Sequence, residues 1–273
     1  MTAVTAKQRT VLKPSILTDL LLHTGIIEML KEMEGIFGDF GIDYYLVGAV
    51  ARDIHLSADK SAEAKRKTND VDLAIKINDE GQYNELKKAL IATGRFTPHP
   101  MEAIKLFYNN RIEVDLLPFG EIEGPDINVN PTDPAFVLNM PGLREIYPFV
   151  EDIKIDKDFS IKVCTMEGLI LLKLISNDDR PERTKDISDI EHIIRVYFDL
   201  YSGNIYEDQF DTMELYDTAQ NDYLQLVCCR VIGRKMKELL KGSDGLRERI
   251  EQILAKRPTT WWQAMLEGIK DNV

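Results

Sequence analysis

The stretch that decides the fold is Asn69-Asp70-Val71-Asp72-Leu73-Ala74-Ile75-Lys76-Ile77. From Asp70 onward the residues alternate with a period of two, which is typical of a β-strand. Side chains at positions i and i+2 of a strand share one face, so Asp70 and Asp72 are expected on the same side, about 7 Å apart at Cα. The stretch therefore predicts a strand that opens with two carboxylates.

A strand-to-helix turn precedes this strand in the sequence. Residues 43–48 predict a short buried strand that ends at Gly48, and 50–56 predict a helical turn or two. The small residues Gly48 and Ala49 at the junction would let backbone N–H groups and a helix N-terminus approach a phosphate group. Packing alone also explains a turn of small residues, so its meaning depends on what lies next to it.

A third carboxylate is expected on a neighbouring strand. Residues 103–108 and 111–117 predict two strands joined at Asn109-Asn110, a pair that suits a tight turn. Asp115 falls on the second of these strands, and neighbouring strands lie about 5 Å apart. Asp115 can therefore join the acidic pair of the first strand.

Three clustered carboxylates are typical of one of two chemical roles. Unpaired carboxylates this close repel one another and shift their pKa values, so such a cluster normally binds divalent cations or supplies a general base. Magnesium is the default cation for oxygen ligands of this kind. The alternative is that the acidic residues merely end their strands on the solvent side.

The rest of the chain predicts an α+β protein: a small mixed-sheet domain over residues 15–164, followed by a mostly helical domain over 165–273. The segment 118–148 holds six of the eleven prolines and is predicted to be a surface loop, a candidate lid. A further strand is expected near 160–164. Helices are expected over 15–38 with a break at Gly25, then over 80–93, 165–176, 184–200, 207–241, 244–257 and 259–270.

Composition excludes several classes of protein. The chain has 273 residues and a formal net charge of −12, which argues against a protein that coats nucleic acid over its whole surface. Its three cysteines are an odd number and have no metal-ligand spacing to a histidine, so neither a disulfide scaffold nor a zinc site is expected. No apolar run reaches the roughly 18 residues of a membrane span, and the N-terminus lacks an apolar signal core, so we expect a cytoplasmic protein.

With Gly48-Ala49, Asp70-Val71-Asp72 and Asp115, the sequence resembles the DNA polymerase β-type nucleotidyltransferase superfamily. Residues 46–53 with 69–74 also look like the head region of tRNA CCA-adding enzymes. The resemblance implies that Asp70, Asp72 and Asp115 are the catalytic residues and hold two Mg²⁺ ions. It further implies that Gly48, Ala49 and Arg52 bind a nucleoside triphosphate (NTP).

A second resemblance covers roughly residues 40–200. Glu167-Gly168-Leu169-Ile170-Leu171-Leu172-Lys173-Leu174-Ile175, followed by Arg180, Arg183, Lys185-Asp186 and Asp189, is similar to AbiE-type toxin nucleotidyltransferases. In that branch a lysine on a buried helix and a basic segment ending in (Arg/Lys)-Asp-x-x-Asp follow the polymerase-like core. The resemblance implies that Lys173 and Asp186 contribute to nucleotide binding. It also implies a toxin–antitoxin or abortive-infection setting with a cognate antitoxin protein.

Lys173 falls within a segment that predicts an almost wholly apolar, buried helix. A buried ammonium is costly unless an anion meets it, and nucleotide phosphates could be that anion. The alternatives are that Lys173 reaches solvent or pairs with Glu167 or Asp186. Asp186 and Asp189 lie at i and i+3 and are expected opposite a buried apolar stripe, facing outward or toward a cleft.

Two basic segments are candidates for binding the molecule that accepts the nucleotide. Residues 230–257 hold nine basic and four acidic residues, a local charge of +5 that could track an RNA backbone such as a tRNA acceptor stem. The alternative is a solvated helix face with its own acidic partners. The basic run 60–67 just before the acidic strand could instead guide an anionic substrate.

The expected function is Mg²⁺-dependent transfer of a nucleoside monophosphate from an NTP to an acceptor hydroxyl, with loss of pyrophosphate. Two alternatives remain open. One is an antibiotic-type nucleotidyltransferase that acts on a small molecule, and the other is a catalytically silent nucleotide-binding regulator. The expected partners are an NTP, RNA or tRNA through residues 230–257, and an antitoxin, with no membrane.

Overall fold

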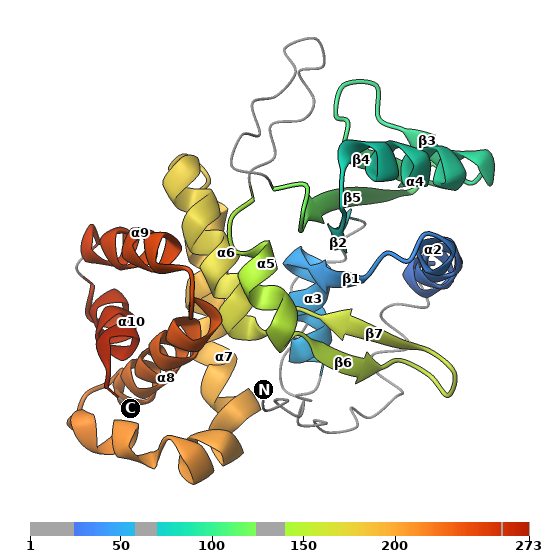
Figure 1. Cartoon of the computed structure of the whole chain (residues 1–273). Helices are drawn as coiled ribbons and strands as arrows, with labels where there is room; N and C mark the ends of the chain where they lie inside the picture. The colour runs from blue at the N-terminus through green and yellow to red at the C-terminus, as the bar shows by residue number, and fades with distance from the viewer. Residues whose placement is uncertain (1–24, 58–69, 124–139, 258, 273) are drawn as a thin grey trace, which may run out of the picture. The chain divides into compact units, whose positions relative to one another are not determined.

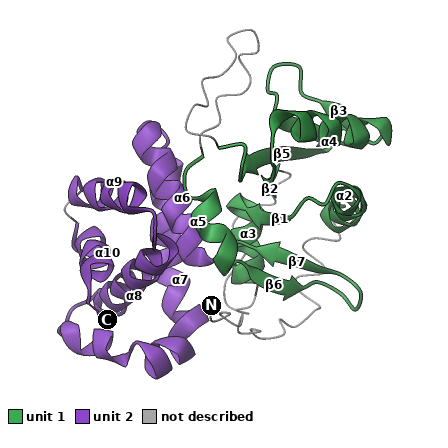
Figure 2. Ribbon diagram, viewed as in Figure 1, with its two compact units in different colours: residues 1–164 green, residues 165–273 purple. Residues whose placement is uncertain are grey.

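The computed structural model describes residues 25–57, 70–123, 140–257 and 259–272. The chain divides into two compact units, residues 1–164 and 165–273, shown in green and purple in Figure 2. The first unit holds a β-sheet with helices, and the second is helical, so the chain is an α+β protein as the sequence predicts. Within the described ranges, no helix combines the length and apolar character needed to cross a bilayer.

A mixed sheet of seven strands forms the first unit (Figure 1). Its spatial order is β3-β4-β5-β2-β1-β7-β6. The pairs β2–β5 and β1–β7 are parallel, and the other neighbours are antiparallel. The strands are β1 (Tyr44–Val47), β2 (Asp70–Lys76), β3 (Phe96–Pro98), β4 (Lys105–Tyr108), β5 (Ile112–Phe119), β6 (Glu151–Lys154) and β7 (Ser160–Val163).

Strand β2 lies in the middle of this sheet, between β5 and β1. Val71, Leu73 and Ile75 are buried on one face of the strand, and Ala74 is buried on the other face, which also carries Asp70 and Asp72. Asp70 and Asp72 are the first and third residues of the strand; Asp70 is exposed and Asp72 is half-buried. The period-two stretch of the sequence is thus the inner strand that sets the position of the acidic pair.

The first unit also contains helices. Helix α2 buries a stripe of apolar side chains at the spacing of an amphipathic helix, and the side chain of Asp79 caps α4 by accepting a hydrogen bond from the Gln82 N–H. The helices are α2 (Ile26–Asp39), α3 (Gly48–Leu56), α4 (Glu80–Ala92), the short α5 (Leu143–Ile146) and the 3₁₀ turn η1 (Tyr147–Phe149).

The second unit begins at the N-cap of α6, where the Thr165 hydroxyl accepts a hydrogen bond from the Gly168 N–H. Helix α6 is apolar on most sides and largely buried, as its sequence predicts. The helices of this unit are α6 (Met166–Asp179), α7 (Thr184–Asp208), the 3₁₀ segment η2 (Phe210–Leu215), α8 (Tyr223–Leu239), α9 (Asp244–Ala255) and α10 (Thr260–Lys270).

Helices α8 and α10 cross at two glycines. A Cβ on Gly233 would lie 2.1 Å from the Met265 carbonyl oxygen, and a Cβ on Gly268 would lie 2.2 Å from the Arg230 carbonyl oxygen. The backbones therefore approach closely because neither residue carries a side chain at the crossing. This approach places the C-terminal end of α10 beside α8.

The structure corrects several elements predicted from the sequence. The single helix expected over 207–241 is interrupted, because α7 ends at Asp208 and α8 begins only at Tyr223. The short strands β3 and β6 were not predicted, and the loop expected from Pro118 begins only after Phe119. The basic run 60–67, residues 15–24 and most of the candidate lid, 124–139, lie outside the described residues.

Candidate functional site

Two of the predicted carboxylates lie directly side by side. In the parallel pair of β2 and β5, Asp72 is the register partner of Asp115. Partners in a parallel ladder project to the same face, so both carboxylates lie on one side of the sheet. Asp70 is the register partner of Glu113, one step back along the same strands.

Gly48 brings a helix N-terminus to this pair. It is the first residue of α3 and has a φ of +67°, a conformation that side-chain-bearing residues rarely adopt. A Cβ on residue 48 would lie 2.0 Å from Asp72 Oδ2 and 2.8 Å from Asp72 Cγ. The Asp72 carboxylate thus lies against the backbone at the start of α3, where the helix dipole favours negative charge.

The environment of the Asp115 carboxylate satisfies it only in part. Its Oδ1 atom is buried and has no hydrogen-bond partner. Burial, followed by the charge of Asp72, raises the pKa of Asp115 to about 7. A buried carboxylate oxygen without a donor is costly, and a bound cation or proton would relieve that cost.

Of the three predicted metal ligands, the structure pairs Asp72 directly with Asp115. In the ranges that the structure covers, no group of three or more histidine, cysteine, aspartate or glutamate side chains is gathered tightly enough to hold a metal ion. Asp72 and Asp115 form a pair, and Asp70 lies exposed at the first residue of β2. The donor set still fits a hard cation such as Mg²⁺, because both groups are carboxylates and Asp115 Oδ1 lacks a donor.

A lysine that the sequence analysis missed lies beside the pair. Lys105 is the first residue of β4 and the antiparallel register partner of Asp115. Its ammonium hydrogen-bonds the Glu113 carboxylate and lies 3.9 Å from Asp115 Oδ1 and 3.4 Å from Glu102 Oε2. The site therefore contains an internal cation as well as carboxylates.

The other residues predicted to bind the nucleotide in the first unit lie on α3. Ala49 is its second residue and half-buried. Arg52 is only 7% exposed, and its guanidinium donates hydrogen bonds of 2.9 and 2.8 Å to Asp53 Oδ1. Arg52 thus belongs to a buried ion pair in the present structure.

In the second unit, Lys173 meets anions of its own chain. Its Nζ atom donates a 2.7 Å hydrogen bond to Asp189 Oδ2 and lies 3.5 Å from Asp186 Oδ1. Its side chain is 16% exposed. The alternative in which Lys173 pairs with Asp186 describes the structure, with Asp189 as the closer partner.

The expected orientation of Asp186 was wrong. Asp186 is 2% exposed rather than facing outward. It accepts a 3.1 Å hydrogen bond from the Ser176 hydroxyl and lies 3.3 Å from Arg183 Nε. With Lys173 and Arg183 as its cations, Asp186 anchors the first turn of α7 to α6.

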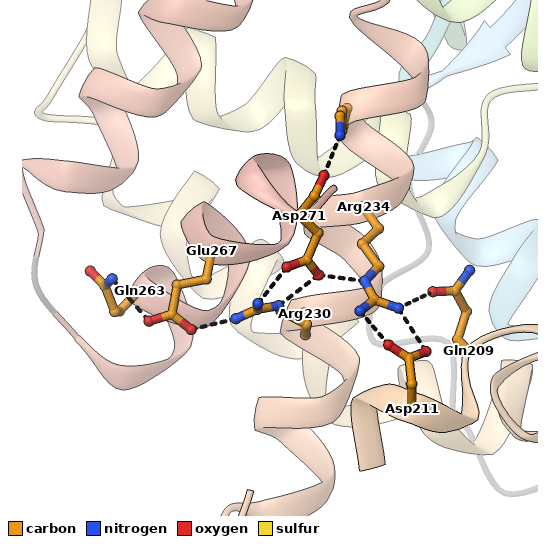
Figure 3. Close-up of polar contacts among 8 residues, drawn as sticks. Gln209, Asp211, Arg230, Arg234, Gln263, Glu267 and Asp271 are labelled. Carbon is orange, nitrogen blue, oxygen red and sulfur yellow. Dashed lines mark hydrogen bonds and ion pairs between the residues drawn. The ribbon is translucent and has the colours of Figure 1, made fainter. Parts of the chain in front are cut away.

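The basic segment 230–257 is largely neutralised within the second unit. Figure 3 shows the beginning of the segment, where Arg234 donates to Asp211 and Asp271, and Arg230 donates to Asp271 and Glu267. Farther along, Arg249 and Lys256 pair with Asp178. Eight of the nine basic residues contact another side chain or a backbone carbonyl, with the remaining contacts made by Lys235, Lys237, Arg247 and Arg257. This pairing corresponds to the alternative of a helix face with acidic partners.

Comparison with known proteins gives structural likenesses only. No protein-family model and no curated protein matches the chain. The fold is similar to that of an antigenic nucleotidyltransferase-like protein from Paracoccidioides brasiliensis, with a TM-score of 0.37 and 16% identity over 85% of this chain and 94% of that chain. It is also similar to the antibiotic-resistance factor ANT(2'')-Ia, with a TM-score of 0.36 and 13% identity over 81% and 95% of the two chains. With TM-scores this low, neither protein indicates what this chain does.

Proposed function

We propose that the chain is a Mg²⁺-dependent nucleotidyltransferase whose catalytic carboxylates are Asp72 and Asp115, with Asp70 beside them. The observation that carries the proposal is the register pair Asp72–Asp115 next to Gly48. Two carboxylates on adjacent parallel strands, one of them with an oxygen that lacks a hydrogen-bond donor, are suited to a divalent cation. The helix N-terminus at Gly48 adds a place for a phosphate group.

Each residue has a distinct task in this proposal. Asp72 and Asp115 would hold Mg²⁺, which polarises the α-phosphate and lowers the pKa of an acceptor hydroxyl when bound. In the metal-free protein, burial and the charge of Asp72 raise the pKa of Asp115 to about 7, so binding of Mg²⁺ near neutral pH would release a proton from this carboxyl group. Gly48 and Ala49 would leave the backbone N–H groups of α3 accessible to the triphosphate.

The acceptor that we propose is a small hydroxyl-bearing molecule. The tract 230–257, which suggested an RNA surface, has its charge balanced by acidic side chains such as Asp178, Asp211 and Asp271. Balanced charge weakens the attraction to a phosphate backbone, because that attraction scales with the number of phosphates neutralised. A small acceptor would need no such basic surface.

The biological setting rests on the resemblance of residues 167–189 to AbiE-type toxins. We propose on that ground alone that the protein is a toxin with a cognate antitoxin. Inducible expression of wild type and of Asp72→Asn in a bacterial host tests the setting. Growth arrest by wild type and not by the variant would support it, and equal growth of both cultures would contradict it.

The activity itself is tested by label transfer. Purified protein is incubated with each α-³²P-labelled NTP and Mg²⁺, in one arm with total tRNA and in another with a panel of aminoglycosides and lincosamides. We expect label on a small molecule with wild type and none with Asp72→Asn. Label on tRNA would move the acceptor back to RNA.

A thermal-shift measurement, combined with the label-transfer assay, distinguishes an active enzyme from a catalytically inactive nucleotide-binding protein. Mg²⁺ and an NTP together should raise the melting temperature (Tm) more than either alone, because ligands that bind the native state stabilise it. An NTP shift without any label transfer would indicate a nucleotide-binding regulator. Neither shift nor transfer would overturn the proposed function.

A further inference from the structure

Lys105, which belongs to no motif of the sequence, lies among acidic side chains. Three carboxylates face its ammonium, those of Glu102, Glu113 and Asp115. The side chain is 14% exposed, so these charges act with less screening than surface pairs do. Lys105 is thus a fixed positive charge next to one half of the proposed metal pair.

The geometry separates two effects of this charge. The hydrogen bond of Lys105 goes to Glu113, whereas Asp115 Oδ1 is 3.9 Å away and has no hydrogen-bond partner. The ammonium therefore attracts Asp115 through space but leaves that oxygen free of a donor. A cation could bind Asp115 Oδ1 while Lys105 stays on Glu113.

The charge of Lys105 is present under all ordinary conditions. A lysine ammonium ordinarily keeps its proton at neutral pH, and the carboxylates of Glu102, Glu113 and Asp115 around this one favour its charged form. At neutral pH a divalent cation at Asp72 and Asp115 would therefore always meet a positive neighbour. Repulsion between a unit charge and a divalent cation about 5 Å apart weakens binding by roughly tenfold even when water screens the two charges fully.

We propose that Lys105 is a positioning residue that makes divalent-cation binding at Asp72 and Asp115 depend on the nucleotide. The bare cation binds weakly because Lys105 repels it. A triphosphate brings negative charge that offsets this repulsion, so cation and nucleotide enter together. This inference rests on the proposed function, since it takes the carboxylate pair to be a metal site.

A purely structural role for Lys105 is the main competing explanation. As a cross-strand partner it could simply hold β4 against β5 through Glu113. In that case its removal would lower the melting temperature without changing the affinity for cations. The affinity for a metal ion, measured without nucleotide, is the readout that a structural role would not move.

The test measures Mn²⁺ binding to the nucleotide-free protein by electron paramagnetic resonance, with Lys105→Met and Lys105→Arg. We expect about tenfold tighter Mn²⁺ binding for Lys105→Met and wild-type binding for Lys105→Arg, which keeps the charge. Lys76→Met is the matched control. It removes one charge from the last residue of β2, where the ammonium lies 5.3 Å from the Tyr147 ring centroid rather than beside Asp115.

A second arm repeats the titration with a non-hydrolysable ATP analogue. The gain in Mn²⁺ affinity that the analogue produces should be about tenfold smaller in Lys105→Met than in wild type. Lys105→Gln replaces the methionine variant if that variant does not fold. Equal Mn²⁺ affinity of wild type and the neutral variants would overturn the inference and leave the proposed function standing. No Mn²⁺ binding by wild type, with or without the analogue, would overturn the proposed function itself.

Discussion

The backbone of Gly48 and the carboxylate of Asp72 share a space that no side chain on residue 48 can enter. A Cβ there would lie 2.0 Å from Asp72 Oδ2, and the φ of Gly48 is +67°. A left-handed conformation costs a residue with a side chain about 1–2 kcal/mol, and overpacking adds about 1–3 kcal/mol. Gly48→Ala should therefore lower the free energy of unfolding by about 2–5 kcal/mol in a urea titration.

Two variants separate the clash from the backbone cost. Gly94 also has a positive φ, of +74°, but a Cβ there would meet nothing within 4 Å. Gly94→Ala should therefore cost only the backbone part, about 1–2 kcal/mol. In an Asp72→Ala background, Gly48→Ala should cost less than in the wild-type background, because only the Cβ of residue 72, at 3.2 Å, would remain in contact. An equal, large cost with and without the Asp72 carboxylate would show that the two residues are not in this contact.

The stability of the metal-free protein should depend on the proton of Asp115. Burial and the charge of Asp72 raise its pKa to about 7, above the ordinary 3.8 of the unfolded chain. Between these two values the folded state holds a proton that the unfolded state releases, so stability falls as pH rises from about 4 to 7. Asp115→Asn should then raise the melting temperature at pH 8 and raise it less at pH 5, measured in EDTA.

Asp43 provides a control of opposite sign. The hydrogen bonds from Tyr147 and Lys162 lower its pKa, so its stabilising effect is present at neutral pH and is lost only as pH falls through the acidic range. Asp43→Asn should therefore lower the melting temperature at pH 8. If Asp115→Asn also destabilised at pH 8, its carboxylate would be a satisfied structural group.

Much of the first unit could be predicted because its strands carry local signals. The period-two pattern of β2 and the small residues after β1 can each be recognised within one short stretch of sequence. The edge strands β3 and β6, of three and four residues, have too few positions to show a period. The break after Asp208 was missed because the next residues keep helical content in η2 before the polar turn that precedes α8.

The contact between Lys105 and Asp115 was missed because a shift of one residue in the pairing of β4 with β5 decides which side chain lies opposite Asp115. A two-residue turn at Asn109-Asn110 would place Asp115 opposite Ile104. In the structure both asparagines have positive φ and Arg111 joins the loop, since its N–H donates to the Tyr108 carbonyl. Tyr108 then pairs with Ile112, and Asp115 faces Lys105. Turn residues predict that a hairpin exists, but the loop length decides which side chains meet.

Catalysis should fail without loss of folding when either central carboxylate is replaced. Asp72→Asn and Asp115→Asn each remove a charge from a pair that repels itself in the metal-free protein. We expect label transfer to fall by at least about a hundredfold, as is typical when a catalytic electrostatic group is lost, with an unchanged or higher melting temperature. Large destabilisation of both variants would instead indicate a structural role.

For Lys173, the structure predicts the opposite effect on stability from the one that its apolar helix suggests. A lysine alone in such a helix would be costly, and methionine in its place would stabilise the protein. Here Lys173 lies 3.5 Å from the 2%-exposed Asp186 and donates to Asp189. Removing one partner of a buried pair leaves the other charge uncompensated, so Lys173→Met should cost about 2–4 kcal/mol of unfolding free energy.

The double variant Lys173→Met with Asp186→Asn identifies the pair as the cause. Because the amide carries no charge to compensate, the double variant should be more stable than Lys173→Met alone, and the two single costs should not add. The stability is measured by urea unfolding, and binding of an NTP by isothermal titration on the same proteins. Wild-type stability of Lys173→Met would show that its ammonium is solvated rather than paired. Lower NTP affinity with unchanged stability would return Lys173 to the nucleotide site that the sequence resemblance implies.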